Sequence, residues 1–287
     1  MFGDSGSLAP LRPQRVNTKH YPFPAIMRTA LTPEQINEYR GNGFLFFPDL
    51  LTADEVGELE TAVLEAISTM GKNKIADGLE WLEGDGFYDK VFTQRLNLWR
   101  INDTVKRYTR ATGLGQMAAR LAGVDAMRIW CDQALIKGPF ANPTAYHLDN
   151  PFWSFHSHDS ISVWIALDDA TLENGCLWFL PGSHKMAGFE VTPIGMDMNG
   201  IFETYPQMTG IDPVPVPMKA GDCGFHNGLV AHGAGPNMTR GRRMAMTAAF
   251  MPDGSTFNGE QNILPNDYFN SLAPGDPLDN DNQNPLV

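Results

Sequence analysis

Cysteine is scarce in this chain of 287 residues, which contains three of them. Cys131, Cys176 and Cys223 lie far apart in the sequence, and no two of them form the close CxxC spacing of a metal or redox motif. A sparse, odd-numbered set of thiols argues against a disulfide framework and is typical of reduced cysteines in cytosolic proteins. We therefore expect a cytoplasmic protein.

Long apolar runs are also missing. No stretch reaches the length of about 18 residues that a membrane-spanning helix needs. The N-terminal sequence MFGDSGSLAPLRPQRVNTKHYPFP has no apolar core behind its basic residues, so it does not read as a secretory signal. Its Pro, Gly and Ser content predicts an extended arm over residues 1–31, and we expect no membrane partner.

Basic tracts are absent as well, and the formal net charge is -12. The C-terminal segment, residues 253–287, contains no Lys or Arg, and we expect it to pack on the domain that precedes it. A chain with this excess of acidic residues is not expected to bind nucleic acid. The expected partner is a small-molecule substrate. The sequence does not indicate an oligomeric state. The acidic residues of the segment are Asp253, Glu260, Asp267, Asp276, Asp279 and Asp281.

The first third of the chain carries helix signals. TPEQ at residues 32–35 and TADE at 52–55 each place a capping threonine three positions before Gln or Glu. A further helical pair is predicted within 103–122, with a break near Gly113.

From about residue 126, short β-branched and aromatic stretches alternate with Gly, Pro and Asn. This texture predicts a mainly β protein, a double-stranded β-helix (jelly roll) with flanking helices. No linker separates the two textures, so one domain over 32–252 is expected, with a helical N-terminal part. A long insertion at 186–212 is a candidate active-site lid. Strands are expected at 127–136, 144–149, 161–167, 176–180, 214–218, 222–226 and 242–250.

The stretch AYHLDNPFWSF, residues 145–155, contains a histidine and an aspartate two positions apart. On a strand, such positions face the same side, so His147 and Asp149 are predicted to reach one point while Leu148 packs the other way. They would supply two ligands of the 2-His-1-carboxylate triad, which binds Fe(II) and leaves positions open for a co-substrate and O2. Alone the motif is weak, because a surface histidine beside a turn aspartate gives the same letters.

A second stretch, FHNGLVAHGAGPNMTRGRRMAM at residues 225–246, strengthens the prediction. His232 precedes a glycine-rich turn and is a candidate third ligand. Arg243 begins an expected strand, and an arginine can bind a carboxylate through two parallel charge-assisted hydrogen bonds. A buried arginine beside an iron site is what the distal carboxylate of 2-oxoglutarate would need.

Three motifs together resemble the phytanoyl-CoA dioxygenase family: HLD at 147–149, NGCLWFLPGSHK at 174–185, and HGAG…R from His232 to Arg243. The resemblance extends from about residue 32 to residue 250. It implies an Fe(II)/2-oxoglutarate-dependent dioxygenase with a double-stranded β-helix fold, which uses O2 and is helped by ascorbate in vitro. It also implies that His147, Asp149 and His232 hold the metal, and that Arg243 binds the 5-carboxylate of 2-oxoglutarate.

The resemblance assigns two further co-substrate contacts, Gln133 and Trp164. For Trp164, core packing is an equally good interpretation, whereas a polar Gln133 on an inner strand needs a partner. Ala234 departs from the pattern, because some relatives carry a hydroxyl residue there that bonds to the co-substrate. Halogenating relatives have Gly or Ala at the carboxylate position, so Asp149 favours hydroxylation of an unactivated carbon, or another oxidation that abstracts a hydrogen atom, over halogenation.

Two alternatives stay open at this stage. One is a jelly-roll protein with a different metal, for instance a zinc hydrolase, in which Arg243 would lack a purpose. The other is a non-catalytic binding protein, in which the three metal-ligand candidates are incidental. Nor does the sequence settle the substrate, because the family acts on acyl-CoA thioesters, amino-acid derivatives and natural-product scaffolds. His156 and His158 follow the HLD motif and are open candidates for substrate contact.

Overall fold

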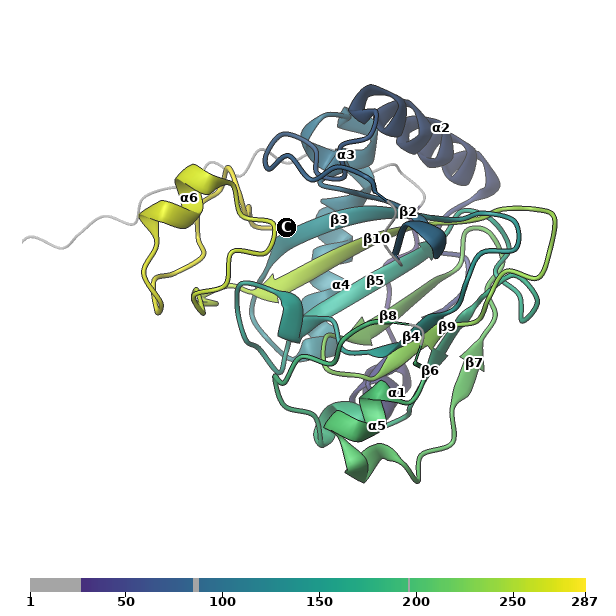
Figure 1. The fold of residues 1–287 in the computed structure, drawn as a ribbon. Helices are drawn as coiled ribbons and strands as arrows, with labels where there is room; N and C mark the ends of the chain where they lie inside the picture. The colour runs from purple at the N-terminus through teal and green to yellow at the C-terminus, as the bar shows by residue number, and fades with distance from the viewer. Residues whose placement is uncertain (1–26, 85–87, 196) are drawn as a thin grey trace, which may run out of the picture.

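Two antiparallel sheets form the centre of the protein (Figure 1). The computed structural model describes residues 27–84, 88–195 and 197–287. The larger sheet has six strands in the order β1-β8-β5-β10-β3-β2, and the smaller has four in the order β4-β9-β6-β7. The described strands leave the two sheets separate, without closing a barrel. The arrangement confirms the expected mainly β, jelly-roll core.

The elements have the following bounds. The helices are α1 (Pro33–Asn42), α2 (Ala53–Met70), α3 (Asp103–Thr109), α4 (Thr112–Ala122), α5 (Gly200–Thr204) and α6 (Asn266–Ser271). The strands are β1 (Phe44–Phe47), β2 (Thr93–Leu96), β3 (Met127–Lys137), β4 (Thr144–His147), β5 (Ile161–Ala166), β6 (Leu177–Phe179), β7 (Val214–Val216), β8 (Cys223–Asn227), β9 (His232–Ala234) and β10 (Arg243–Pro252). Single 3-10 turns are η1 (Tyr88–Lys90), η2 (Leu98–Arg100), η3 (Asn150–Phe152), η4 (Ser183–Lys185) and η5 (Pro206–Met208).

Both predicted capping boxes start a helix. The side chain of Thr32 accepts a hydrogen bond from the Gln35 backbone at the start of α1, and Thr52 accepts one from Glu55 at the start of α2. Each satisfies a backbone N–H that the first helical turn leaves without a partner. The N-terminal third is not entirely helical, however, because β1 and β2 both join the larger sheet.

Alternation along the central strands divides the interior into two layers. On β10, Met244 and Met246 face the helices α1–α4, whereas Arg243 and Ala245 face the smaller sheet. In the view of Figure 1, α4 lies behind the larger sheet, and α2 and α3 lie above it. The site lies in the layer between the two sheets, on the face of β10 that carries Arg243.

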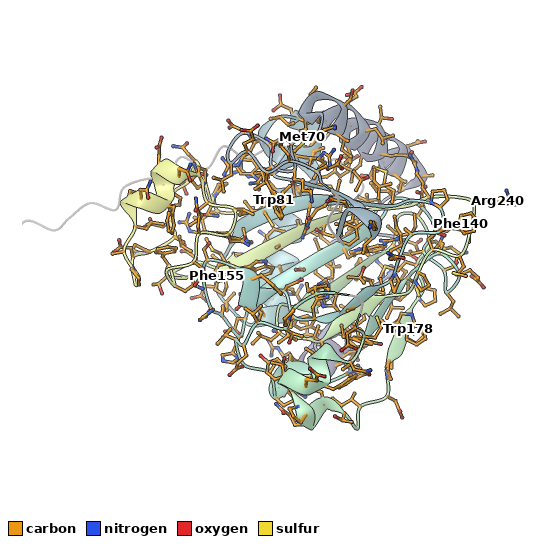
Figure 2. All side chains as sticks on the ribbon, viewed as in Figure 1. Met70, Trp81, Phe140, Phe155, Trp178 and Arg240 are labelled. Atoms are coloured by element: carbon orange, nitrogen blue, oxygen red, sulfur yellow. The ribbon has the colours of Figure 1, made fainter. Side chains whose placement is uncertain are left out.

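The C-terminal segment contacts the start of β3. Arg128 pairs with Asp253 at 2.5 Å and with Asp281 at 2.9 Å, and its guanidinium also donates to the Asn284 carbonyl. Ile263 packs in an apolar cluster together with Phe155. Phe155 is fully buried, whereas Phe140 and Arg240 lie at the right edge of the molecule in Figure 2.

The N-terminal arm predicted for residues 1–31 falls outside the described residues up to residue 26. Beyond that point Met27 and Leu31 are buried against the helical layer. Within the described part of the chain, no helix has the length and apolarity to cross a membrane.

Candidate functional site

Two strands of the smaller sheet bring the two predicted histidine ligands together. His147 is the last residue of β4 and His232 the first of β9, and the two are cross-strand partners with ring centroids 4.3 Å apart. In each, the Nδ1 atom lies beside a backbone carbonyl, at 2.9 Å from Ala145 and 3.1 Å from Val230. A carbonyl only accepts, so Nδ1 carries the proton and Nε2 keeps a free lone pair in the neutral ring.

Asp149 completes the group, although not from a strand. Strand β4 ends at His147, and Asp149 precedes η3 with helical backbone angles, so the prediction that both residues share one strand was wrong. Leu148 still packs the other way, in a separate buried cluster. Potential ligand atoms of the three side chains all lie within 4.8 Å of one another.

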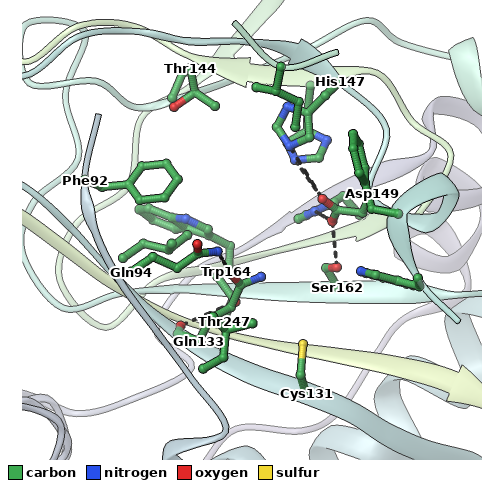
Figure 3. A pocket seen from close by; sticks show the side chains of 18 of the residues that line it. Phe92, Gln94, Cys131, Gln133, Thr144, His147, Asp149, Ser162, Trp164 and Thr247 are labelled. Carbon is green, nitrogen blue, oxygen red and sulfur yellow. Dashed lines mark hydrogen bonds and ion pairs between the residues drawn. The ribbon is translucent and has the colours of Figure 1, made fainter. Parts of the chain in front are cut away.

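The two carboxylate oxygens of Asp149 have different surroundings. Oδ1 lies 3.6 Å from Nε2 of His147 and 3.7 Å from Nε2 of His232. Oδ2 accepts a hydrogen bond from Ser162 at 3.0 Å and lies 3.2 Å from Nε2 of His226 (Figure 3). One oxygen therefore faces the two histidine lone pairs while the other is held in place.

The ionisation states of His147, Asp149 and His232 are suited to binding a cation. Burial alone would raise the pKa of Asp149, but the three neighbouring histidines, His232 above all, hold it well below its usual range. Burial, aided by His147, lowers the pKa of His232 to about 3. An ionised carboxylate and neutral imidazoles are the forms that bind a metal, so the donor set fits Fe(II).

Arg243 is buried at the start of β10 and lies over the ring of Trp164, with 5.2 Å from Cζ to the ring centroid. Its Nε and Nη1 have no hydrogen-bond partner within the described chain. Burial lowers the pKa of Arg243 to about 10. A buried guanidinium with unpaired donors is costly unless an anion binds to it.

Lys137 lies beside this arginine and already has partners. It is the cross-strand partner of Arg243 and is fully buried. Its Nζ donates to the carbonyls of Asn142 and Gly235 at 2.7 and 3.0 Å. Burial and the nearby Arg243 lower the pKa of Lys137 to about 7. Lys137 therefore holds two loops together through their carbonyl groups. Of the two cationic side chains, Arg243 is the one with N–H groups available to an anion.

A cavity of about 450 Å³ connects the three potential ligands with Arg243. Gln133 and Trp164 also line it, as the resemblance implied. The side chain of Gln133 accepts a hydrogen bond from Gln94 at 2.8 Å (Figure 3). All six predicted site residues thus meet at one cavity, and their roles as ligands remain predictions.

His156 and His158 are not among the described residues that line the cavity. Both instead contact Phe189 of the long insertion, and His156 stacks on its ring at 4.4 Å between centroids. From the same insertion, Ile194 reaches the cavity.

Sequence reasoning missed several lining residues. Ser162 alternates with Ile161 and Val163 on a predicted strand, so its polar side chain could have been assigned to the inner face. Gln94 lies in the part of the chain expected to be helical, where nothing signals a strand. His226 also lines the cavity, and its Nδ1 is buried without a hydrogen-bond partner among the described residues.

Comparison with known proteins identifies the family. The family model described as phytanoyl-CoA dioxygenase matches residues 39–245. The dioxygenase lolE1 of Epichloe uncinata is 30% identical over 233 residues, which cover 78% of this chain and 84% of that protein.

Solved structures agree with this match. The non-heme alpha ketoglutarate dependent carbocyclase SnoK from nogalamycin biosynthesis has a TM-score of 0.72 and 26% identity, covering 90% of this chain and 96% of its own. The epimerase SnoN, solved with Fe3+, alpha ketoglutarate and nogalamycin RO, has a TM-score of 0.68 and 27% identity, covering 88% of this chain and 97% of its own.

The predicted enzyme class and the predicted cofactors, Fe(II), 2-oxoglutarate and O2, are confirmed at the level of the family. The chain belongs to the phytanoyl-CoA dioxygenase family, whose members are non-haem iron oxygenases.

Proposed function

We propose that this protein is an Fe(II)/2-oxoglutarate-dependent dioxygenase that hydroxylates an unactivated carbon of a small or mid-sized organic substrate. One observation carries the proposal: a 2-His-1-carboxylate group and a buried arginine with unpaired donors line the same cavity. The first suits Fe(II), and the second suits the distal carboxylate of a dicarboxylate co-substrate.

His147, Asp149 and His232 would hold the iron, and Arg243 would bind the 5-carboxylate of 2-oxoglutarate. When bound, the iron and its co-substrate couple the decarboxylation of 2-oxoglutarate to succinate and CO2 with the oxidation of a substrate C–H bond by O2. One oxygen atom of O2 enters succinate and the other enters the substrate as a hydroxyl.

Gln133 and Trp164 would complete the co-substrate site. The Arg243 guanidinium lies over the Trp164 ring in a cation–π contact, which would fix the direction of its N–H donors. The side-chain oxygen of Gln133 accepts a hydrogen bond from Gln94. The amide N–H groups of Gln133 would then donate hydrogen bonds to a ligand in the cavity.

The outer part of the cavity favours an uncharged substrate with apolar surface. Apart from Asp149 and Arg243, no Asp, Glu, Lys or Arg lines it within the described residues. Nothing in that lining would pair with the phosphates of an acyl-CoA thioester. Its volume is of the size that encloses a drug-sized molecule. Its apolar wall consists mainly of Trp81, Phe92, Leu96, Trp130, Phe152, Trp153, Ile194 and Ile263.

Asp149 supports hydroxylation over halogenation, because the carboxylate occupies the position that a halide would need. The related SnoK and SnoN are named as a carbocyclase and an epimerase, so oxidation of the same C–H bond can have other outcomes in relatives. The mass of the product distinguishes them: a gained oxygen atom marks hydroxylation, two lost hydrogens mark ring closure, and an unchanged mass marks epimerisation.

The first experiment measures binding of 2-oxoglutarate and formation of succinate by the purified protein with Fe(II) and ascorbate in air. Replacing His147 by Ala should abolish iron binding and succinate formation. Arg243→Ala should retain iron and lose affinity for 2-oxoglutarate. Arg242→Ala is a matched control, since this adjacent arginine pairs with Glu60 and Asp168 at the surface.

Failure of the wild-type protein to bind either iron or 2-oxoglutarate would overturn the proposal. Hydrolytic activity with Zn(II) that is indifferent to Arg243→Ala would favour the zinc hydrolase instead.

A further inference from the structure

A bulge in β3 turns one tryptophan toward the cavity. On β10, Ala249 pairs with Cys131. The next residue, Phe250, pairs with Ile129, so the described register leaves Trp130 without a partner on β10. An extra residue of this kind re-aims a side chain, and such bulges are frequent beside active sites. Trp130 and Cys131 consequently both line the cavity, although adjacent residues of a regular strand face opposite sides.

The indole N–H of Trp130 has no hydrogen-bond partner among the described residues. The side chain is 2% exposed, and its ring lies edge-on to Phe155 with 5.4 Å between centroids. A buried tryptophan N–H usually finds a partner, because leaving it unpaired is costly. Trp99 shares the unpaired Nε1, but it packs in the helical layer and is not among the described lining residues. Trp130 is therefore the one of the two whose donor a ligand in the cavity could satisfy.

The strand register separates Trp130 from the proposed co-substrate site. Arg243 pairs with Lys137 at one end of the two strands. Ala249, at the level of the bulge, lies six residues further along β10, which corresponds to about 20 Å of strand. Trp130 therefore belongs to the end of the cavity that would receive the substrate.

The bulge lies at the same level as the proposed iron site. Ala249 pairs on its other side with Ser162, whose hydroxyl donates to Asp149. Cys131 and Ser162 thus flank β10, two strand spacings or about 10 Å apart. Figure 3 shows the Cys131 thiol directed into the cavity below Ser162. A molecule of moderate size could bond to Trp130 and still present a carbon to the proposed iron site.

We propose that the Trp130 N–H donates a hydrogen bond to the substrate, and that the substrate carries an uncharged oxygen acceptor, such as a ketone, ether or hydroxyl, on an otherwise apolar body. The inference rests on the proposed function, because it names a feature of the substrate of that site. An anionic acceptor fits poorly, because Arg243 lies at the other end and no Lys or further Arg lines the cavity within the described residues.

The test uses matched pairs of probes that share a ring skeleton and differ by a single carbonyl: 1-indanone with indane, 1-tetralone with tetralin, and 9-fluorenone with fluorene. Each is titrated into protein loaded with 2-oxoglutarate and Zn(II), a diamagnetic substitute for Fe(II), and NMR gives the dissociation constants. The quantity compared is the ratio of ketone affinity to hydrocarbon affinity. Trp130→Phe keeps an aromatic ring and removes the N–H, so it should lower this ratio by about three- to tenfold for at least one pair.

Two further proteins separate the hydrogen bond from a general disturbance. Trp99→Phe removes an unpaired N–H outside the cavity lining and should keep the wild-type ratio. Replacement of Trp130 by 3-benzothienylalanine preserves the bicyclic shape and puts sulfur in place of the N–H, so it should lower the ratio as Trp130→Phe does. In the wild type, the indole proton resonance that Trp130→Phe lacks should move downfield with the ketone and not with the hydrocarbon.

An unchanged ratio in both Trp130 variants for every pair would overturn this inference and leave the proposed function intact. So would an indole resonance of Trp130 that responds equally to ketone and hydrocarbon. A wild-type protein that binds neither metal nor 2-oxoglutarate would instead overturn the proposed function, and the ratios measured without metal would still decide the role of Trp130.

Discussion

At the scale of single residues, the surroundings of Asp149 explain how a short motif becomes the proposed metal site. A carboxylate on a turn can rotate, and rotation would move its ligand oxygen away from the two histidines. Ser162 and His226 bond to Oδ2 and so fix Oδ1 on the side of His147 and His232. Groups that orient metal ligands in this way commonly contribute about 10- to 100-fold to metal affinity.

We expect His226→Leu to weaken Fe(II) binding by about tenfold or more, because Asp149 then keeps one partner of two. His226→Gln retains an N–H donor of similar reach and should restore much of the affinity. Competition with a calibrated chelator under nitrogen measures both. His156→Leu serves as the control, since His156 stacks on Phe189 away from the cavity lining. Unchanged iron affinity in His226→Leu would show that Ser162 alone suffices.

The sequence predicted the residues of the site better than their geometry. His147, Asp149, His232 and Arg243 were chosen by motif and meet as expected, but the strand argument for Asp149 fails because β4 ends at His147. The contact between His226 and Asp149 could not be inferred from the sequence. It depends on β8 and the turn after β4 coming together in three dimensions. Local spacing contains no information on such a contact.

At the scale of elements, β3 connects the site to the helical layer. Gln133 on this strand faces the cavity, while the neighbouring Asp132 faces the helices and is completely buried. Oδ2 of Asp132 accepts from the Trp99 backbone at 3.0 Å and from the Thr109 hydroxyl at 3.1 Å. One carboxyl thus joins β3 to η2 and α3.

Stability should fall with rising pH because of this carboxyl. Burial raises the pKa of Asp132 to about 7, against the ordinary value of 3.8, despite hydrogen bonds that act in the opposite direction. Between these two values the folded chain keeps a proton that the unfolded chain loses. The free energy of unfolding therefore decreases with pH by up to about 1.4 kcal/mol per unit, and the loss is complete above about pH 7.

Urea unfolding of the wild type and Asp132→Asn between about pH 4.5 and 8 measures the effect. The amide keeps the acceptor for both donors but cannot titrate, so the stability difference between the two proteins should change across this range. Asp125→Asn, at an exposed position, should follow the wild type. A pH-independent difference for Asp132→Asn would contradict the expected protonation.

The helices with side-chain caps were predictable because their signal is local. The threonines before α1 and α2 each bond a backbone N–H three residues away, and the sequence shows that spacing directly. Strands β1 and β2 were not expected, because their partners β8 and β3 lie far along the chain. In β1 the run FLFF alone does not distinguish a strand from a buried helix segment.

At the scale of the whole molecule, residues 32–252 are proposed to fold as one domain, with 253–287 packed on it. Ligands that bind only the folded state should then stabilise the entire unit. Mn(II) with 2-oxoglutarate, each at about 100 times its dissociation constant, should add roughly 2.7 kcal/mol for each binding step. The melting temperature should therefore rise by several degrees in a single transition.

Differential scanning calorimetry measures this shift. His147→Ala should lose it, while His156→Ala should keep it. Two separate transitions, with only one responding to the ligands, would show that the proposed unit is divided.

The match to the family model ends at residue 245, yet Asn262 and Ile263 line the cavity. The residues proposed to bind iron and 2-oxoglutarate and a part of the cavity wall therefore come from different stretches of this chain. Substitutions in the later stretch can change the cavity wall and leave the proposed iron ligands and Arg243 as they are. We expect a chimaera that exchanges only this segment with that of a relative to change substrate preference and to keep the proposed reaction.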